Sequence, residues 1–266
     1  MTRKKLFFID YDNTIFSHRT MSIPEDARSA LRSVQTTGAG QIILSTGRPA
    51  EAEDLAVFFD DRFRPDGIMG ANSAHITIGD TVLRKIYMQQ ELKDRLIRFA
   101  MERGYCLMCT YNGIWYVSEP DYLRSLGKYE MDQTAWVGKE DFAALSGKNI
   151  YSFFLQAPES ALRETEQHFP EIEVLRMGGE LGGGDIVRRG FNKASGLRLT
   201  AQYLGYDLAD TVAIGDSMND MEMIRQAGLG IAMGNAMQSV RDGADYVTAD
   251  IDAGGLAQAI RYALSI

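Results

Sequence analysis

The segment Lys5-Leu-Phe-Phe-Ile-Asp10-Tyr-Asp-Asn-Thr14 decides which fold this sequence predicts. Its first half is a short apolar run bounded by charge, which is typical of a parallel strand buried on both faces. Its second half places Asp10 and Asp12 directly at the end of that strand. Side chains two residues apart in extended chain face the same way, so both carboxylates can aim at one point. Open α/β folds bind their ligands beyond this edge of the sheet.

Strands and helices alternate on both sides of a central segment. Residues 22–25 (Ser-Ile-Pro-Glu) have the form of a capping box and predict a helix that ends at Gly38. A second apolar strand covers 41–45, and Pro49 stands where another helix could begin. The alternation resumes after residue 190, with a helix from Lys193 and strands at 211–214, 230–232 and 246–248. This order predicts an α/β fold with a doubly wound, parallel, Rossmann-like sheet.

The middle of the chain follows a different pattern. Residues 76–82 alternate apolar and polar side chains about Gly79-Asp80, which predicts a hairpin. Beyond it we expect a helix near 89–103, strands near 105–110, 114–117 and 150–156, and a glycine-rich connection at 178–184. We therefore expect a discontinuous core domain, 1–82 and 190–266, interrupted by an α+β domain at 83–189.

Composition and charge restrict the class of protein. The 266 residues carry 36 Asp and Glu against 28 Lys and Arg, a net charge of −8, which argues against nucleic-acid partners. The apolar run at 6–9 is too short for a signal peptide or a membrane span, so we expect a cytoplasmic protein without membrane contact. Cys106 and Cys109 fall on an expected strand, where side chains three apart face opposite ways, so we expect neither a disulfide nor redox chemistry.

Polar residues also follow other expected strands. Ser45, Thr46 and Gly47 end the second strand, where hydroxyl and backbone N–H groups can hold phosphoryl oxygens. Lys193 begins a helix, and Gly215-Asp-Ser-Met-Asn-Asp220 follows the strand at 211–214. Carboxylates for Mg²⁺, hydroxyl and amide donors for phosphate and one lysine together suit phosphoryl transfer, which depends on placing and neutralising charge.

In these four segments, and in their order, the chain resembles the haloacid dehalogenase superfamily, specifically its Cof-type phosphatases of subfamily IIB with a C2 cap. The stretches 228–236 and 244–248 are similar to the tail of that group. The resemblance implies a nucleophile, Asp10, and a general acid/base, Asp12. It also implies phosphate contacts from Thr46, Gly47, Lys193 and Asn219. Mg²⁺ is then held by Asp10, the Asp12 backbone carbonyl and Asp216, with Asp220 orienting these groups.

The chain departs from the family pattern at two places. Asn13 stands where glycine is usual, and Asn72-Ser-Ala74 has serine where the similar stretch has glycine. Asn tolerates the left-handed backbone better than most residues, so we expect Asn13 to preserve the turn.

The resemblance implies a phosphoric monoester hydrolase that forms an aspartyl-phosphate. We expect a small phosphorylated metabolite, preferably a sugar or sugar-alcohol phosphate and otherwise a nucleotide-like or coenzyme phosphate, and a monomer or weak homodimer. Residues of the cap would select the substrate: Tyr111, Trp115, Tyr116 and Arg188 are the candidates. The scattered histidines, His18, His75 and His168, receive no catalytic role.

Three alternatives compete with this interpretation. A phosphotransferase or sugar-phosphate mutase of the same superfamily would hand the phosphoryl group to a sugar. A receiver-type signalling domain would carry its aspartate at the end of the third strand, where this chain has Met69-Gly70. A catalytically dead binding protein is disfavoured because each core motif residue is present.

Overall fold

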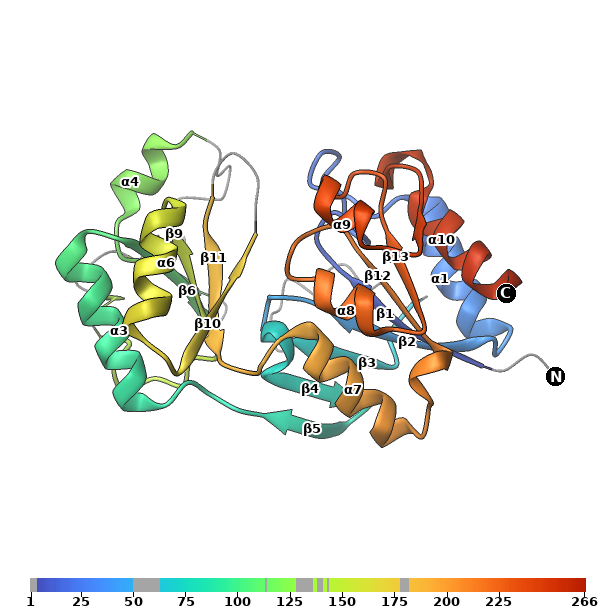
Figure 1. Ribbon diagram of the computed structural model, residues 1–266, viewed down its shortest axis with the longest axis horizontal. Coiled ribbons are helices and arrows are strands. Elements are labelled where there is room, and N and C mark those ends of the chain that lie inside the picture. Colours follow the sequence, from blue (N-terminus) through green and yellow to red (C-terminus); the bar gives the residue numbers. More distant parts are fainter. Residues whose placement is uncertain are drawn as a thin grey trace. The chain divides into compact units, whose positions relative to one another are not determined.

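The computed structural model describes residues 4–49, 63–112, 114–127, 136–137, 141–142, 144–177 and 182–266. The chain divides into two compact units (Figure 1). The first consists of Met1–Lys85 and Phe191–Ile266, and the second of Ile86–Gly190. The helix expected after Pro49 and most of the connection expected at 178–184 lie outside the described residues.

The first unit contains one sheet with the strand order β14-β13-β12-β1-β2-β3-β4-β5. Its strands are β1 (Lys5–Asp10), β2 (Gly40–Ser45), β3 (Gly67–Gly70), β4 (His75–Ile78), β5 (Thr81–Lys85), β12 (Thr211–Gly215), β13 (Leu229–Ala232) and β14 (Tyr246–Val247). The strands from β14 to β3 pair in parallel, whereas β3, β4 and β5 pair antiparallel. The parallel α/β sheet and the expected hairpin are both confirmed.

Helices cover both faces of this sheet, as Figure 1 shows, with α1 beside α10 on one face and α7 beside α8 on the other. Their bounds are α1 (Glu25–Thr36), α7 (Lys193–Leu204), α8 (Met221–Gln226), α9 (Gln238–Asp242) and α10 (Gly255–Ser265), with single 3₁₀ turns η1 (Ala71–Ser73), η3 (Leu208–Asp210) and η4 (Ile251–Ala253). Helix α1 buries Ala27, Leu31 and Val34, which recur at the helical period. Burial of each larger apolar side chain contributes roughly 1.5–3 kcal/mol.

The predicted capping box of α1 is wrong. Pro24 is the N-cap, and no side chain caps the helix. Ser22 instead forms an antiparallel bridge with Ser17, and its hydroxyl lies 3.0 Å from the hydroxyl of Thr20. Because Ser22 is already engaged in this turn, its side chain is not available to the first helical N–H groups.

The strands at the centre of the sheet are buried on both faces and their ends are in register. Phe7 and Phe8 point to opposite faces, yet both are completely buried. Asp10 pairs with Ser45 across β1 and β2, and Ile9 pairs with Ile214 of β12 on the other side. The polar residues that follow these strands therefore meet at one edge of the sheet.

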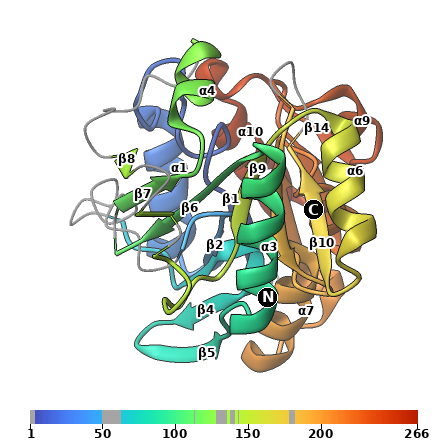
Figure 2. The same cartoon turned by 90° about the vertical axis from the view of Figure 1, so that its left-hand side faces the viewer.

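The second unit is an antiparallel sheet in the order β10-β11-β9-β6-β7-β8, in which only the short pairing of β7 with β8 is parallel among the described strands. Its elements are α3 (Gln90–Arg103), β6 (Cys106–Tyr111), β7 (Ile114–Val117), α4 (Pro120–Ser125), β8 (Trp136–Val137), β9 (Phe153–Gln156), α6 (Glu159–His168), β10 (Ile172–Arg176) and β11 (Gly184–Arg188). Figure 2 shows α3 and α6 in front of this sheet. The sequence patterns predict neither α6 nor β10.

Side chains along β6 alternate between the two faces of the second sheet. Cys109 belongs to the apolar cluster under α3 and α6, and Cys106 belongs to the cluster that includes Leu123 of α4. The expectation that the two cysteines face opposite ways is confirmed, and both are free thiols. Burial raises the pKa of the Cys106 thiol to about 11 and also raises that of Cys109. Burial therefore favours the protonated thiol at both positions at neutral pH.

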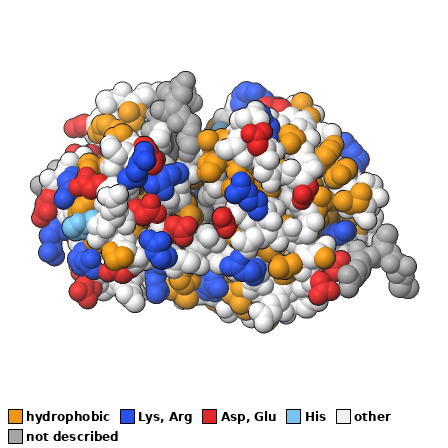
Figure 3. All heavy atoms as spheres, viewed as in Figure 1, with side chains coloured by type: hydrophobic (Ala, Val, Ile, Leu, Met, Phe, Trp, Pro, Cys, Tyr) orange, Lys and Arg blue, Asp and Glu red, His pale blue; other side chains and the backbone are white. Residues whose placement is uncertain are grey.

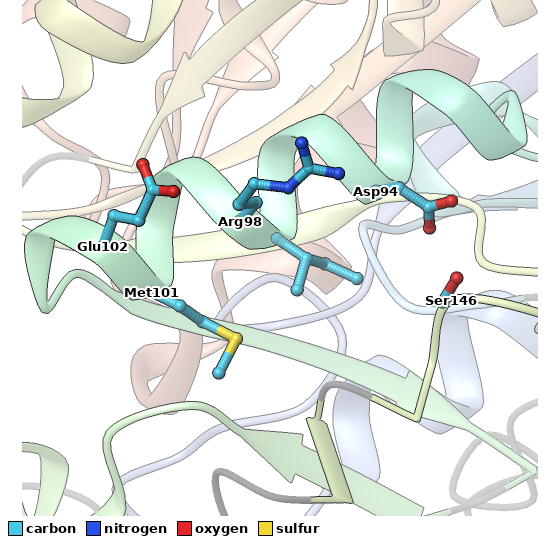
Figure 4. Close-up of a pocket in the computed structure, with 6 residues that line it drawn as sticks. Asp94, Arg98, Met101, Glu102 and Ser146 are labelled. Atoms are coloured by element: carbon cyan, nitrogen blue, oxygen red, sulfur yellow. The ribbon is translucent and has the colours of Figure 1, made fainter.

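One face of the molecule is mixed in charge. On the face shown in Figure 3, acidic and basic side chains are interspersed among the coloured residues. A groove of about 410 Å³ runs along α3, where Figure 4 shows Asp94, Arg98, Met101 and Glu102 on the helix and Ser146 opposite. Among the described residues, no helix combines the length and the apolar character that a bilayer crossing requires.

Candidate active site

A buried lysine joins two aspartates at the edge of the first sheet. Lys193 Nζ donates to Asp10 Oδ1 at 2.5 Å and to Asp220 Oδ1 at 2.6 Å. The Lys193 and Asp220 side chains are fully buried, and that of Asp10 is 7% exposed. Lys193 occupies the first position of α7, which Asn192 begins with a capping box to Ser195. The cap fixes where the helix begins, and thereby the backbone that carries Lys193.

Asp216 completes a group of three carboxylates. Asp10, Asp216 and Asp220 each offer an oxygen, and the three oxygens lie within 4.8 Å of one another. Asp10 ends β1, and the other two follow β12 in the segment that begins with Gly215. The register of the two neighbouring strands therefore brings together residues more than 200 positions apart in sequence.

Asp220 is held in place by the backbone of its own loop. Its Oδ2 accepts hydrogen bonds from the N–H groups of Asp216 at 3.2 Å and Ser217 at 3.1 Å, and from the Ser217 hydroxyl at 3.3 Å. Gly215 makes this geometry possible, because a Cβ at that position would lie 2.4 Å from Asp220 Cγ.

The electrostatics of the group favour a bound cation. Burial and the charge of Asp220 raise the pKa of Asp10 to about 8, although Lys193 acts in the opposite direction. Burial and the charge of Asp10 raise the pKa of Asp216 to about 9. Burial alone would lower the pKa of Lys193, but the two aspartates raise it. One ammonium therefore does not offset two buried carboxylates and a third that is partly buried.

The donor set fits Mg²⁺. This ion prefers oxygen ligands and is commonly held by one or two carboxylates together with water and phosphate oxygens. Asp10 and Asp216 offer such carboxylates within the 4.8 Å group, whereas both oxygens of Asp220 are already engaged, Oδ1 with Lys193 and Oδ2 with backbone N–H groups of its own loop. The chemistry of these residues is thus that of a hard divalent cation site.

Asp12 belongs to a neighbouring set of contacts rather than to the carboxylate group. Arg48 donates to it twice, from Nη2 to Oδ1 at 2.7 Å and from Nε to Oδ2 at 3.1 Å. His18 Nε2 lies 2.7 Å from the same Oδ1. Partial burial alone would raise the pKa of Asp12, but the hydrogen bonds from His18 and Arg48 outweigh it and hold that pKa well below its usual range. Sequence reasoning assigned no role to Arg48 or His18.

Thr46 and Gly47 lie where β2 leaves the sheet. The Thr46 hydroxyl, which is fully buried, accepts a hydrogen bond from the Arg48 N–H at 3.1 Å. The Thr46 carbonyl accepts from Asn72 N–H at 3.1 Å. Asn72 Oδ1 in turn accepts from Asn219 Nδ2 at 3.4 Å, which links this loop to the segment after β12. Asn72 is a third residue, after Arg48 and His18, whose role the sequence did not predict.

Two departures from the family pattern have a backbone explanation. Asn13 has φ 58°, so the left-handed turn expected there is confirmed. Ser73 has φ 81°, a region that disfavours side chains other than glycine. Its hydroxyl lies 3.2 Å from that of Ser195, and its carbonyl accepts from Arg84 Nη1 at 3.2 Å. These contacts hold the strained residue in place.

Known proteins are similar to this chain both in sequence and in architecture. A family model described as haloacid dehalogenase-like hydrolase matches residues 7–260. The YkrA protein of Bacillus subtilis (strain 168) is 27% identical over 260 residues, which is 97% of this chain and 96% of the relative. The sugar phosphatase BT4131, described as HAD subclass IIB, superposes with a TM-score of 0.79 at 27% identity over 98% of both chains. The phosphatase BT1666 of Bacteroides thetaiotaomicron superposes with a TM-score of 0.83 at 25% identity, over 99% of this chain and 96% of the other chain.

The fold and these matches define a hydrolase with an α/β core. The chain belongs to the haloacid dehalogenase-like hydrolase family, and the resemblance to its Cof-type phosphatases of subclass IIB is confirmed. It is a phosphoric monoester hydrolase, of a family that acts on small phosphorylated substrates.

Replacement of Gly215 tests the close approach of Asp220. In Gly215→Ala the new methyl group would displace the Asp220 carboxylate, so we expect kcat to fall by at least about tenfold and the free energy of unfolding by about 1–3 kcal/mol. Gly147→Ala is the matched control, because a Cβ there meets nothing within 4 Å. Steady-state rates and thermal unfolding measure both effects. Equal behaviour of the two variants would contradict the argument.

The raised pKa values predict how Mg²⁺ binding depends on pH. In the folded, metal-free protein the raised pKa values keep Asp10 and Asp216 protonated, whereas in the unfolded chain both groups lose their protons above a pKa of 3.8. These two groups therefore make the free energy of unfolding fall as pH rises from about 4 towards about 8. Asp12, with its lowered pKa, contributes stability that is lost only below the ordinary value of 3.8. Since Mg²⁺ competes with protons, the rise in Tm on adding Mg²⁺ should be larger at about pH 8.5 than at about pH 6. A rise independent of pH, measured by differential scanning fluorimetry, would contradict this.

Proposed function

We propose that this phosphatase is Mg²⁺-dependent, forms an aspartyl-phosphate on Asp10 and hydrolyses sugar or sugar-alcohol phosphates. The observation that carries the proposal is the position of Asp10. Its buried carboxylate contacts Lys193 and lies within the carboxylate group formed with Asp216 and Asp220. A nucleophile, a cation site and a fixed positive charge therefore occupy one point at the end of β1, which suits attack on a phosphate dianion.

Asp10 is the nucleophile in this proposal. A carboxylate oxygen attacks phosphorus and forms an O–P bond while the bond from phosphorus to the leaving oxygen breaks. Burial restricts water around the carboxylate, and the Lys193 ammonium at 2.5 Å fixes its orientation. Holding the attacking oxygen in place removes much of the entropic cost of bringing nucleophile and phosphorus together.

Asp12 moves the proton in both halves of the reaction. In its protonated form, which the lowered pKa makes the minor form in the free protein at neutral pH, it gives the proton to the leaving oxygen, which departs as an alcohol. As a carboxylate it then takes a proton from the water that attacks the aspartyl-phosphate, which releases inorganic phosphate and restores Asp10. Asp12 suits this role because its side chain is 32% exposed, whereas that of Asp10 is 7% exposed, so it has access to solvent and to a leaving group.

The remaining residues would position and neutralise the phosphate. Asp10, Asp216 and the Asp12 backbone carbonyl would hold Mg²⁺, which would supply charge neutralisation for the phosphoryl oxygens. Lys193 adds a fixed positive charge, and Asp220 keeps it in place through the 2.6 Å contact. The Thr46 hydroxyl, the Gly47 backbone and the Asn219 amide are the hydrogen-bond donors proposed for the phosphate oxygens.

The proposed substrate class rests on similarity and on the second unit. BT4131, which matches over 98% of both chains, is described as a sugar phosphatase. In the second unit Tyr111 and Tyr116 are in edge-to-face contact at 6.4 Å and pack against its core, as Trp115 does against a second cluster. We propose that these partly buried aromatics and Arg188 select the leaving group.

The nucleophile is tested by Asp10→Asn, which keeps the shape of the side chain and removes its reactive charge. With Mg²⁺ and p-nitrophenyl phosphate we expect kcat to fall by at least about 10³-fold. Asp242→Asn on α9 makes the same chemical change at an exposed position and should retain full activity. Turnover by Asp10→Asn within tenfold of the unaltered protein, in a sample that unfolds at a similar temperature, would exclude Asp10 as the nucleophile.

The substrate class is tested with a panel of phosphate esters. We expect kcat/KM for a hexose or sugar-alcohol phosphate to exceed that for nucleoside monophosphates and phosphoglycolate by about tenfold or more. Product analysis distinguishes hydrolysis from phosphotransfer, since a bisphosphorylated sugar would indicate a mutase. Flat and low values across the panel would contradict the proposed class.

A further inference from the structure

The Asp12 carboxylate is held asymmetrically by two cationic or polar side chains from different segments. Arg48, after β2, contacts both carboxylate oxygens, whereas the His18 ring contacts one of the two, Oδ1. Oδ1 therefore has two partners at 2.7 Å and Oδ2 has one at 3.1 Å. This asymmetry leaves Oδ2 as the less engaged of the two oxygens and therefore the one more available to a leaving group.

Both partners of Asp12 rest on one pair of aromatic rings. Tyr11 and Phe16 are stacked, with centroids 5.7 Å apart and planes 8° from parallel. The His18 ring meets Phe16 edge to face at 5.3 Å and 84°, and Arg48 Cζ lies 5.5 Å from the centre of the Tyr11 ring. Tyr11 and Phe16 are 0% and 3% exposed, so this pair is a rigid support. Two independent contacts thus determine where the His18 ring lies: an aromatic support and the Asp12 oxygen.

The turn that carries His18 is fastened to the rest of the first unit. Isolated β-bridges join Asp12 to Phe16 and Ser17 to Ser22. Arg19, the next residue, pairs with Asp250 at 2.7 Å and with Asp252. Because the turn is held on both sides of the histidine, little further ordering is needed to keep Nε2 at Asp12.

We propose that His18 is a positioning residue for Asp12, which fixes the carboxyl plane so that Oδ2 faces the leaving group. The proposal rests on the general-acid role proposed for Asp12. A purely stabilising role explains the geometry less well, since the His18 side chain is 43% exposed and exposed ion pairs contribute little to folding. His18 acts through Asp12 and makes no contact with the reacting phosphorus in this scheme.

The test compares two leaving groups in three variants. An alkyl phosphate such as glycerol phosphate needs its leaving oxygen protonated, whereas p-nitrophenolate leaves without a proton. We expect His18→Ala to lower kcat on the alkyl ester by about tenfold or more, with KM and the rate on p-nitrophenyl phosphate nearly unchanged. His18→Gln should restore most of the loss, because its amide nitrogen matches the reach of Nε2. His18→Asn, which is too short, should not.

His168→Ala is the matched control. His168 is also exposed and also packs against phenylalanine rings, Phe99 at 4.7 Å and Phe169 at 4.8 Å, but it lies in the second unit. It should leave both substrates unaffected. Similar losses on both esters in the His18 variants, or equal rates for Gln and Asn, would overturn the positioning role even if His18→Ala folds poorly.

Asp12→Asn separates failure of this inference from failure of the proposed function. If Asp12→Asn loses activity selectively on the alkyl ester and no His18 variant does, the positioning role is excluded and the acid role stands. If Asp12→Asn shows no dependence on the leaving group, the acid role itself is wrong, and the inference falls with it.

Discussion

The first unit depends on one buried contact, the Lys193 ammonium between Asp10 and Asp220. Removing a charged group from water costs several kcal/mol, and only close pairing offsets that cost. The contact joins the end of β1, the start of α7 and the loop after β12, so these segments have to meet accurately for the charges to be tolerated. The same pairing orients the Asp10 carboxylate. The contact that holds these three segments together therefore also orients the side chain of Asp10 in the site.

The contact also explains how an acidic protein accommodates an anionic substrate. A net charge of −8 describes the whole surface, whereas the phosphate would meet a local field. In that field Lys193 is permanently positive, and the raised pKa values of Asp10 and Asp216 show that their full ionisation requires another positive charge. A divalent cation would provide it and would reverse the local sign. The unfavourable clustering of acids is thus the source of the affinity proposed for Mg²⁺.

Sequence reasoning succeeded where a local rule determines geometry. Buried strands end in register, so Asp10, Thr46 and Gly215 could be expected at one edge of the sheet, and Asn13 could be expected to take a left-handed backbone. It failed for Arg48 and His18. Their contacts with Asp12 span 36 and 6 residues and depend on how two loops leave the sheet, for which no periodic pattern exists. The capping box predicted at Ser22 was wrong for the same reason, because that serine forms a β-bridge with Ser17 within the turn.

The sequence by itself determined the order of strands and helices in the first unit, the placement of acids at strand ends and the family to which the chain belongs, because these follow from hydrophobic periodicity and short motifs. Only the tertiary structure decided how the acids are divided. Asp10 lies with Asp216 and Asp220, whereas the Asp12 carboxylate contacts Arg48 and His18. The reason is physical: a carboxylate's partners are set by distances of about 3 Å between loops distant in sequence, and a one-dimensional pattern carries no such distance.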